Sequence, residues 1–169
     1  MNKTNLSAIL EELFNNNTDY TNPMQAVNQA DSIAALSVDL YTDANRFIYE
    51  LLQNADDSPS DNGVNVWIKL FNDKLVVAHS GRAFDERDIR GICNINNGTK
   101  KSDLKKTGYK GIGFKSVFGQ SNNVVIYTGG EYFRFDSSYN FGWKWEKEAT
   151  QSGWEIKNDK KFQYPWQII

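Results

Sequence analysis

Residues 46–57 read RFIYELLQNADD, and this stretch decides how the rest of the chain is interpreted. Its apolar positions 47, 48, 51 and 52 recur at helical spacing, while Glu50, Asn54 and Asp57 follow one another at i, i+4 and i+7. At 3.6 residues per turn these three polar side chains fall within roughly 60° of arc on one helix face. Carboxylates and an amide beside an apolar stripe are costly to bury unless they bind something polar. Two interpretations follow: a solvated surface helix, or a helix whose polar face binds a ligand.

The composition is typical of one globular domain that is long enough to bury a core, with 169 residues, 40% hydrophobic and 24% charged. The net charge of −2 argues against electrostatic binding to nucleic acid or to a membrane surface. The single cysteine, Cys93, excludes an internal disulfide and a cysteine-based zinc cluster. Because the start of the chain has no signal-peptide pattern and no apolar run is long enough to span a membrane, we expect a cytoplasmic protein.

The spacing of apolar residues changes along the chain from a helical period to a period of two. Helices are expected at 6–14, ended by the asparagines at 15–17, at 24–40, and from an N-cap at Thr42 or Asp43 onward. A hairpin of strands is expected at 64–70 and 75–78, and further strands at 123–127, 131–135, 143–147 and 165–169. A short helix opened by Asp85, a lysine-rich connector at 94–108 and a helix start near 114 lie between them.

This order of elements predicts an α+β fold, with a mixed and mostly antiparallel sheet and helices on one face. Without an internal repeat or a linker, residues 1–169 are expected to form a single domain. The apolar end at 165–169 has no polar tail, which indicates that this domain is the N-terminal part of a larger protein, cut near residue 169.

A glycine-rich loop, Gly108-x-x-Gly111-x-Gly113, opens the expected helix near 114. Such a loop can offer backbone N–H groups to an anion, and glycines allow phosphate oxygens to approach the backbone. The alternative is a flexible loop that only caps the helix. The Rossmann and Walker interpretations fail, because no strand directly feeds the loop and no Gly-Lys-Ser/Thr ending follows.

Five lysines lie in the eleven residues before that loop closes. They form either a solvated basic loop or a source of positive charge for a triphosphate. The lysines are Lys100, Lys101, Lys105, Lys106 and Lys110.

Three motifs, taken in order, resemble the GHKL ATPases. They are Glu50-x-x-x-Asn54-x-x-Asp57, the Gly81 turn after a strand, and the glycine loop continued to Ser116. The stretches 36–57, 108–118 and 126–136 are similar, more narrowly, to the N-terminal ATP-binding domain of sacsin-like and NO VEIN-like proteins. The resemblance covers about residues 36–136. It implies the Bergerat fold, a two-layer α/β sandwich that holds ATP between helices and a sheet under a mobile lid.

By position, the resemblance also implies roles for individual residues in a site for ATP and Mg²⁺. Glu50 would be the general base that deprotonates the attacking water, and Asn54 would be the magnesium ligand. Lys100 would assist from the lid, and Thr128 lies where the family has a hydroxyl near the adenine. Positioning and charge neutralisation of this kind supply most of the catalysis in phosphoryl transfer. The other implied nucleotide-binding residues are Asp57, His79, Gly81, Gly108, Gly111, Ile112, Gly113 and Phe114.

His79 departs from the pattern of the superfamily, most of which has an aspartate there that accepts a hydrogen bond from the adenine amino group. The residue is either a simple strand cap or a contact to the base. A neutral imidazole nitrogen can accept one hydrogen bond, but it lacks the charge and the second oxygen of a carboxylate. Base recognition therefore rests on His79 or on Asp57, Thr128 or ordered water, and adenine selectivity stays open.

Three functions are compatible with the sequence. The first is an ATP-binding, slowly hydrolysing and chaperone-like module, whose lid closure on Mg-ATP changes contacts with downstream domains or drives homodimerisation. Turnover is expected to be slow, because family members often need a catalytic arginine or lysine from a following domain. The second is a regulatory module that binds a nucleotide without hydrolysing it. The third, a kinase of the histidine-kinase type, is disfavoured because His79 is the only histidine.

Overall fold

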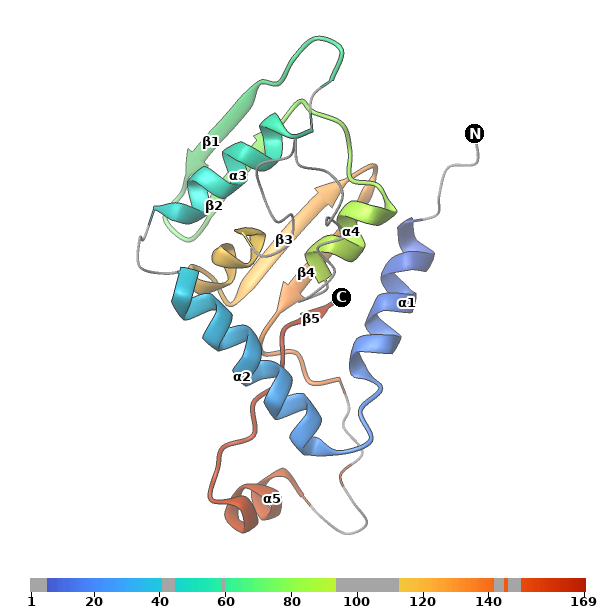
Figure 1. Cartoon of the computed structure of the whole chain (residues 1–169), viewed down its shortest axis with the longest axis vertical. Coiled ribbons are helices and arrows are strands. Elements are labelled where there is room, and N and C mark those ends of the chain that lie inside the picture. Colours follow the sequence, from blue (N-terminus) through green and yellow to red (C-terminus); the bar gives the residue numbers. More distant parts are fainter. Residues whose placement is uncertain (1–5, 41–44, 59, 94–112, 142–144, 146–149) are drawn as a thin grey trace.

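The computed structural model describes residues 6–40, 45–58, 60–93, 113–141, 145 and 150–169, which contain both helices and strands (Figure 1). The helical segments are α1 (Leu6–Thr18), α2 (Pro23–Leu40), α3 (Arg46–Asp56), α4 (Glu86–Cys93), the 3₁₀ helix η1 (Gly113–Gly119) and α5 (Gln151–Asn158). The strands are β1 (Val66–Leu70), β2 (Leu75–His79), β3 (Asn123–Thr128), β4 (Glu131–Asp136) and β5 (Gln167–Ile168). Over these ranges no helix is both long and apolar enough to cross a membrane.

The strands form two small antiparallel sheets. β1 and β2 form a hairpin, in which Val66 pairs with His79 and Leu70 pairs with Leu75. The second sheet has the order β3-β4-β5. Gly129 and Gly130 join β3 to β4 at φ values of +61° and +94°, a conformation that two-residue hairpin turns need and that other residues rarely adopt. Antiparallel pairing is therefore confirmed, whereas the described strands form two sheets and not the single sheet that was expected.

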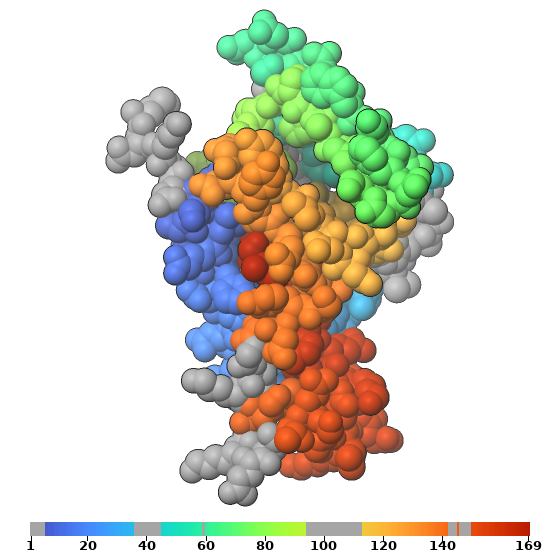
Figure 2. Space-filling model, turned by 180° about the vertical axis from the view of Figure 1, so that it is seen from behind, coloured from blue at the N-terminus to red at the C-terminus, as the bar shows by residue number. Residues whose placement is uncertain are grey.

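Helices and strands form separate layers. In Figure 1, α4 lies over the three-stranded sheet, α1 lies beside it, α2 runs below it, and α3 lies over the β1–β2 hairpin. From behind, the strands of both sheets form much of the surface (Figure 2). Phe133 and Phe135 of β4 are buried while Tyr132 is exposed, as a period of two predicts. The predicted α+β class is confirmed. The buried core consists of Ile9, Leu13, Ile33, Ile89, Ile92, Phe114, Val117, Phe118, Phe133, Phe135 and Ile168.

A second, mostly aromatic cluster surrounds α5. Trp154 and Phe162 are buried there against the start of α2, with ring centroids 5.5 Å apart at nearly right angles. The sequence reasoning missed α5, although its start carries a recognisable signal. Thr150 is the N-cap, and its side chain accepts a hydrogen bond from the backbone N–H of Gly153 at 3.1 Å.

Two other expectations differ from the structure, and a third falls mostly outside the described residues. The helix α1 continues through the asparagines to Thr18, whose hydroxyl donates to the carbonyl of Phe14 at 2.9 Å. The residue that precedes α3 as its N-cap is Asn45, while Thr42 and Asp43 lie outside the described residues. The expected strand at 143–147 also lies outside them, except for Trp145, which belongs to no strand.

Candidate functional site

Glu50 lies in the middle of α3, a helix that packs on the core through its apolar side. Phe47 and Leu51 contact the core, and Ala55 is fully buried. One turn before Glu50, the Nε atom of Arg46 lies 3.6 Å from the carboxylate Oε1 of Glu50. The side chain of Glu50 is 22% exposed, so its carboxylate sits at the edge of the core and can still meet a ligand. The sequence reasoning missed Arg46, although its spacing of four residues from Glu50 is a signal for an ion pair on a helix.

The backbone of Gly113 lies directly against the Glu50 carboxylate. A Cβ atom built on Gly113 would overlap Oε2 and Cδ of Glu50 and would lie 3.1 Å from Oε1. Ser116 closes the first turn of η1, because its buried hydroxyl donates to the carbonyl of Gly113 at 2.6 Å. The fold thus brings together the end of the glycine motif and the central carboxylate of the α3 motif.

The turn at Gly81 connects the end of β2 to the end of α3. The backbone N–H of Arg82 donates to the carbonyl of Ser58 at 3.0 Å. The N–H of Gly81 donates to Nδ1 of His79 at 3.2 Å. A Cβ atom on Gly81 would overlap the Ser58 carbonyl and lie 2.8 Å from that Nδ1 atom, so only glycine fits this turn.

Thr128 ties the same loop to the three-stranded sheet. It is the last residue of β3 and is buried, and its hydroxyl oxygen accepts a hydrogen bond from the backbone N–H of Phe84 at 2.8 Å. The segment 81–84 is therefore bonded at one end to Ser58, just after α3, and at the other end to β3. Its position does not depend on side-chain packing alone.

His79 is half-buried at the start of this turn. Burial lowers its pKa from the ordinary value of 6.5, because removal from water disfavours the charged imidazolium. The ring is therefore neutral at physiological pH.

Asn54 and Asp57 follow Glu50 along the same helix, and both are half-buried. Asp57 is the C-cap of α3, and its backbone N–H donates to the carbonyl of Gln53 at 2.8 Å. The described ranges contain no group of three or more His, Cys, Asp or Glu residues that could hold a metal. Mg²⁺ often takes only one or two protein oxygens and completes its shell with phosphates and water. The magnesium role of Asn54 stays a prediction.

Four residues of the expected site lie outside the described part of the chain, together with the expected lid. They are Lys100, Gly108, Gly111 and Ile112. Phe114 is described, and its ring is buried in the core beside Phe118 and Phe135. Any contact of residue 114 to a ligand must therefore come from its backbone.

Lys115 is a buried cation that the sequence reasoning did not single out. It is 2% exposed, and its Nζ atom donates to the carbonyl of Ile92 in the last turn of α4 at 2.9 Å. Burial lowers the pKa of Lys115 to about 8 and raises the pKa of the neighbouring Cys93 thiol to about 12. This hydrogen bond joins η1 to α4. A lysine between apolar residues in GFKSVF gives no sign in the sequence that it is buried.

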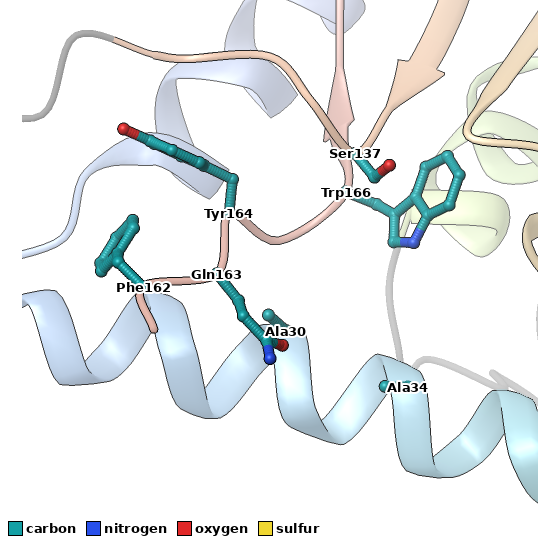
Figure 3. Close-up of a pocket in the computed structure, with 7 residues that line it drawn as sticks. All are labelled: Ala30, Ala34, Ser137, Phe162, Gln163, Tyr164 and Trp166. Carbon is teal, nitrogen blue, oxygen red and sulfur yellow. The ribbon is translucent and has the colours of Figure 1, made fainter. Parts of the chain in front are cut away.

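A separate cavity of about 350 Å³ lies between α2 and the segment that leads into β5 (Figure 3). Phe162, Tyr164 and Trp166 supply its aromatic walls. None of the residues expected to bind a nucleotide lines it. This cavity is therefore not part of the site around Glu50.

The comparisons with known proteins agree with one another. A family model described as the Sacsin domain matches residues 33–167. The chain is 38% identical over 109 residues to the protein NO VEIN of Arabidopsis thaliana, an alignment that covers 63% of this chain and 4% of that protein. It is 35% identical over 95 residues to Sacsin of Homo sapiens, covering 46% of this chain and 2% of that protein. The chain thus spans only a small fraction of these relatives, and no solved structure matches it. Because the family model covers most of its length, the chain belongs to the sacsin domain family.

Proposed function

We propose that this chain is a GHKL-type module with a Bergerat fold, which binds ATP with Mg²⁺ and hydrolyses it slowly within a larger protein. One observation carries the proposal: the Glu50 carboxylate lies against the backbone of Gly113. Hydrolysis of a triphosphate needs a general base and a set of phosphate-binding N–H groups at the same place. A carboxylate on a helix and the end of a glycine loop supply these two parts.

Each residue of the proposed site then has a specific role. Glu50 accepts a proton from the attacking water, and Asn54 offers its amide oxygen to Mg²⁺. The backbone N–H groups of Gly113 and Phe114 donate to phosphate oxygens, which glycine permits because no Cβ blocks the approach. Bound Mg²⁺ neutralises negative charge on the phosphates. Hydrogen bonds to the Ser58 carbonyl and to the Thr128 hydroxyl hold the loop at Gly81 in place. This loop would form the wall of the site next to the purine base of the nucleotide.

The wider role is inferred from the resemblance alone. We expect the module to act in the cytoplasm, to be chaperone-like, and to respond to ATP by changing how it meets downstream domains or a second copy. We expect slow turnover of the isolated module, because family members often take a catalytic cation from a following domain.

The test is calorimetric titration with Mg-ATP and an assay of phosphate release on the same preparation. We expect saturable ATP binding and slow release, and Glu50→Gln should keep the binding and abolish the release. Glu131→Gln, the same change at the start of β4, is the matched control and should change neither. Absence of ATP binding would overturn the proposal. A turnover of about 10 per second, typical of ordinary enzymes, would contradict the slow rate.

A second candidate, a nucleotide-binding module that does not hydrolyse, is favoured by the contact of Arg46 with Glu50 at 3.6 Å. A guanidinium at this distance competes for the lone pairs that a base needs. If this contact is what keeps Glu50 from acting as a base, Arg46→Ala should make phosphate release appear where the unaltered chain shows none. Under the first proposal a Glu50-dependent release is already present in the unaltered chain.

A further inference from the structure

The ring of His79 is held by the backbone of its own turn. Its Nδ1 atom accepts the N–H of Gly81 at 3.2 Å, and the next N–H, that of Arg82, donates to the Ser58 carbonyl at 3.0 Å and holds the turn in place. This bond to the N–H two residues along the chain is the one that Asp or Asn makes in an Asx turn. The ring orientation is thus set by main-chain geometry and not by a ligand.

A nitrogen that accepts an N–H bond carries no proton of its own. The one proton of a neutral imidazole must then lie on the other nitrogen, Nε2. Burial lowers the pKa of His79 and so favours the neutral ring, to which this argument applies. His79 consequently has no free acceptor nitrogen and offers only a hydrogen-bond donor to anything that approaches it.

The second polar group at this turn has a similar character. The hydroxyl oxygen of Thr128 already accepts the N–H of Phe84 at 2.8 Å, so the proton of that hydroxyl is available for donation. The His79 ring and the Thr128 hydroxyl, one at each end of the 80–84 segment, can thus each donate a hydrogen bond. A ligand edge that carries acceptors pairs with them better than an edge that carries an amino group.

We propose that the base pocket of this site binds 6-oxopurine nucleoside triphosphates, such as inosine and guanosine triphosphate, more tightly than ATP, because His79 offers Nε2–H where an acceptor would be needed for adenine. The proposal rests on the proposed nucleotide-binding function. The 6-oxo group accepts from Nε2–H, whereas the adenine amino group at the same place would leave two donors facing each other. An unpaired buried donor disfavours binding, so a preference of about tenfold is expected.

The first experiment is calorimetric titration of the full chain with ATP, inosine triphosphate and GTP in the presence of Mg²⁺. Inosine triphosphate is the decisive probe, because it differs from ATP only in the pairing edge around position 6. We expect it to bind about tenfold more tightly than ATP. Tighter binding of ATP than of inosine triphosphate would overturn the proposal and leave the proposed function intact. Failure of all three to bind would overturn both.

Two variants test whether His79 is the cause. His79→Asp keeps an acceptor for the Gly81 N–H and turns the free edge from donor to acceptor, so the preference should reverse toward ATP. His79→Asn has nearly the same shape as His79→Asp without the charge, and because its Oδ1 would accept the Gly81 N–H, its free edge would be the amide NH2 donor, so it should keep the preference for inosine triphosphate. An unchanged ratio in His79→Asp would overturn the role of His79. Thermal melting of both variants shows whether they remain folded.

The tautomer itself can be measured without any nucleotide. Because His79 is the only histidine, a long-range ¹H–¹⁵N correlation spectrum contains one imidazole. We expect the pattern of a ring protonated on Nε2 alone. A ring protonated on Nδ1 would remove the basis of the proposal even if the chain binds purines.

Discussion

Replacing Gly113 by alanine tests the central contact of the site. The added Cβ would overlap the Glu50 carboxylate, so either this carboxylate or the start of η1 must move. The backbone φ of Gly113 is not among the positive values, so alanine meets no backbone strain there. The effect of Gly113→Ala therefore comes from the clash with one side chain.

The loss of stability in Gly113→Ala depends on which atoms can move to relieve the clash. Overpacking usually costs about 1–3 kcal/mol, and the lower end is expected here because Glu50 is a flexible side chain at the edge of the core. In a Glu50→Ala background the clashing atoms are gone, so Gly113→Ala should cost about nothing. The effects of the two changes on the free energy of unfolding should therefore depart from additivity by about 1 kcal/mol. This exceeds the departure of roughly 0.5 kcal/mol expected of independent sites. Displacing the carboxylate of Glu50, the proposed general base, by roughly 1 Å should also lower any hydrolysis by about 100-fold.

The assay is chemical denaturation of the four members of this double-mutant cycle, with phosphate release measured beside it. Gly153→Ala is the matched control, because the nearest atom to its added Cβ is Thr150 Oγ1 at 3.4 Å, an ordinary contact. It should be neutral or stabilising by up to about 1 kcal/mol, as expected in a helix, and additive with Glu50→Ala. Additivity of Gly113→Ala with Glu50→Ala would refute the close approach of these two residues.

Three further predictions concern stability. Phe135→Ala should lower the free energy of unfolding by about 3–5 kcal/mol because its ring is buried, whereas Tyr132→Ala on the exposed face of β4 should cost less than about 1 kcal/mol; equal costs would contradict the assigned faces. Burial lowers the pKa of Lys115 from 10.5 in the unfolded chain to about 8 in the folded one, so between these values the unfolded chain holds the extra proton. The free energy of unfolding should therefore rise from pH 8 to about 9. Denaturation curves of Lys115→Met should lack this rise. The lowered pKa of His79 means that unfolding takes up a proton below about pH 6.5, so stability should fall from pH 7 toward pH 5.5, less so in His79→Asn; a titration of its ring protons by NMR with a midpoint above 6.5 would contradict this.

The regular elements with strong periodicity were predictable from sequence. The β3–β4 hairpin follows from a period of two around Gly129-Gly130, and α2 from a helical period that begins after Pro23. The helix α5 was missed because it is short and contains Gly153, so its start depends on one cap from Thr150. The sequence also gives no way to decide whether the two sheets join, since pairing depends on distances between strands far apart in the chain.

For the candidate site, the sequence predicted the residue types and their order but not their contacts. That Glu50 lies against Gly113 is a property of how α3 packs beside η1. The donor character of His79 depends on one backbone N–H at Gly81, and the burial of Lys115 depends on the carbonyl of Ile92. Such main-chain partners leave no pattern of their own in the sequence, because every residue except proline offers the same groups.

The position of β5 in the sequence has a consequence for how this domain folds during synthesis. Its two residues lie near the end of the chain, yet Ile168 is buried in the same core as Ile9 of α1, and β5 pairs with β4 in antiparallel fashion. A core that joins the first helix to the last strand has contacts of very high sequence separation, which slow folding. During synthesis, the part of α1 that packs on β5 stays uncovered until residue 168 leaves the ribosome, and only then can the core close.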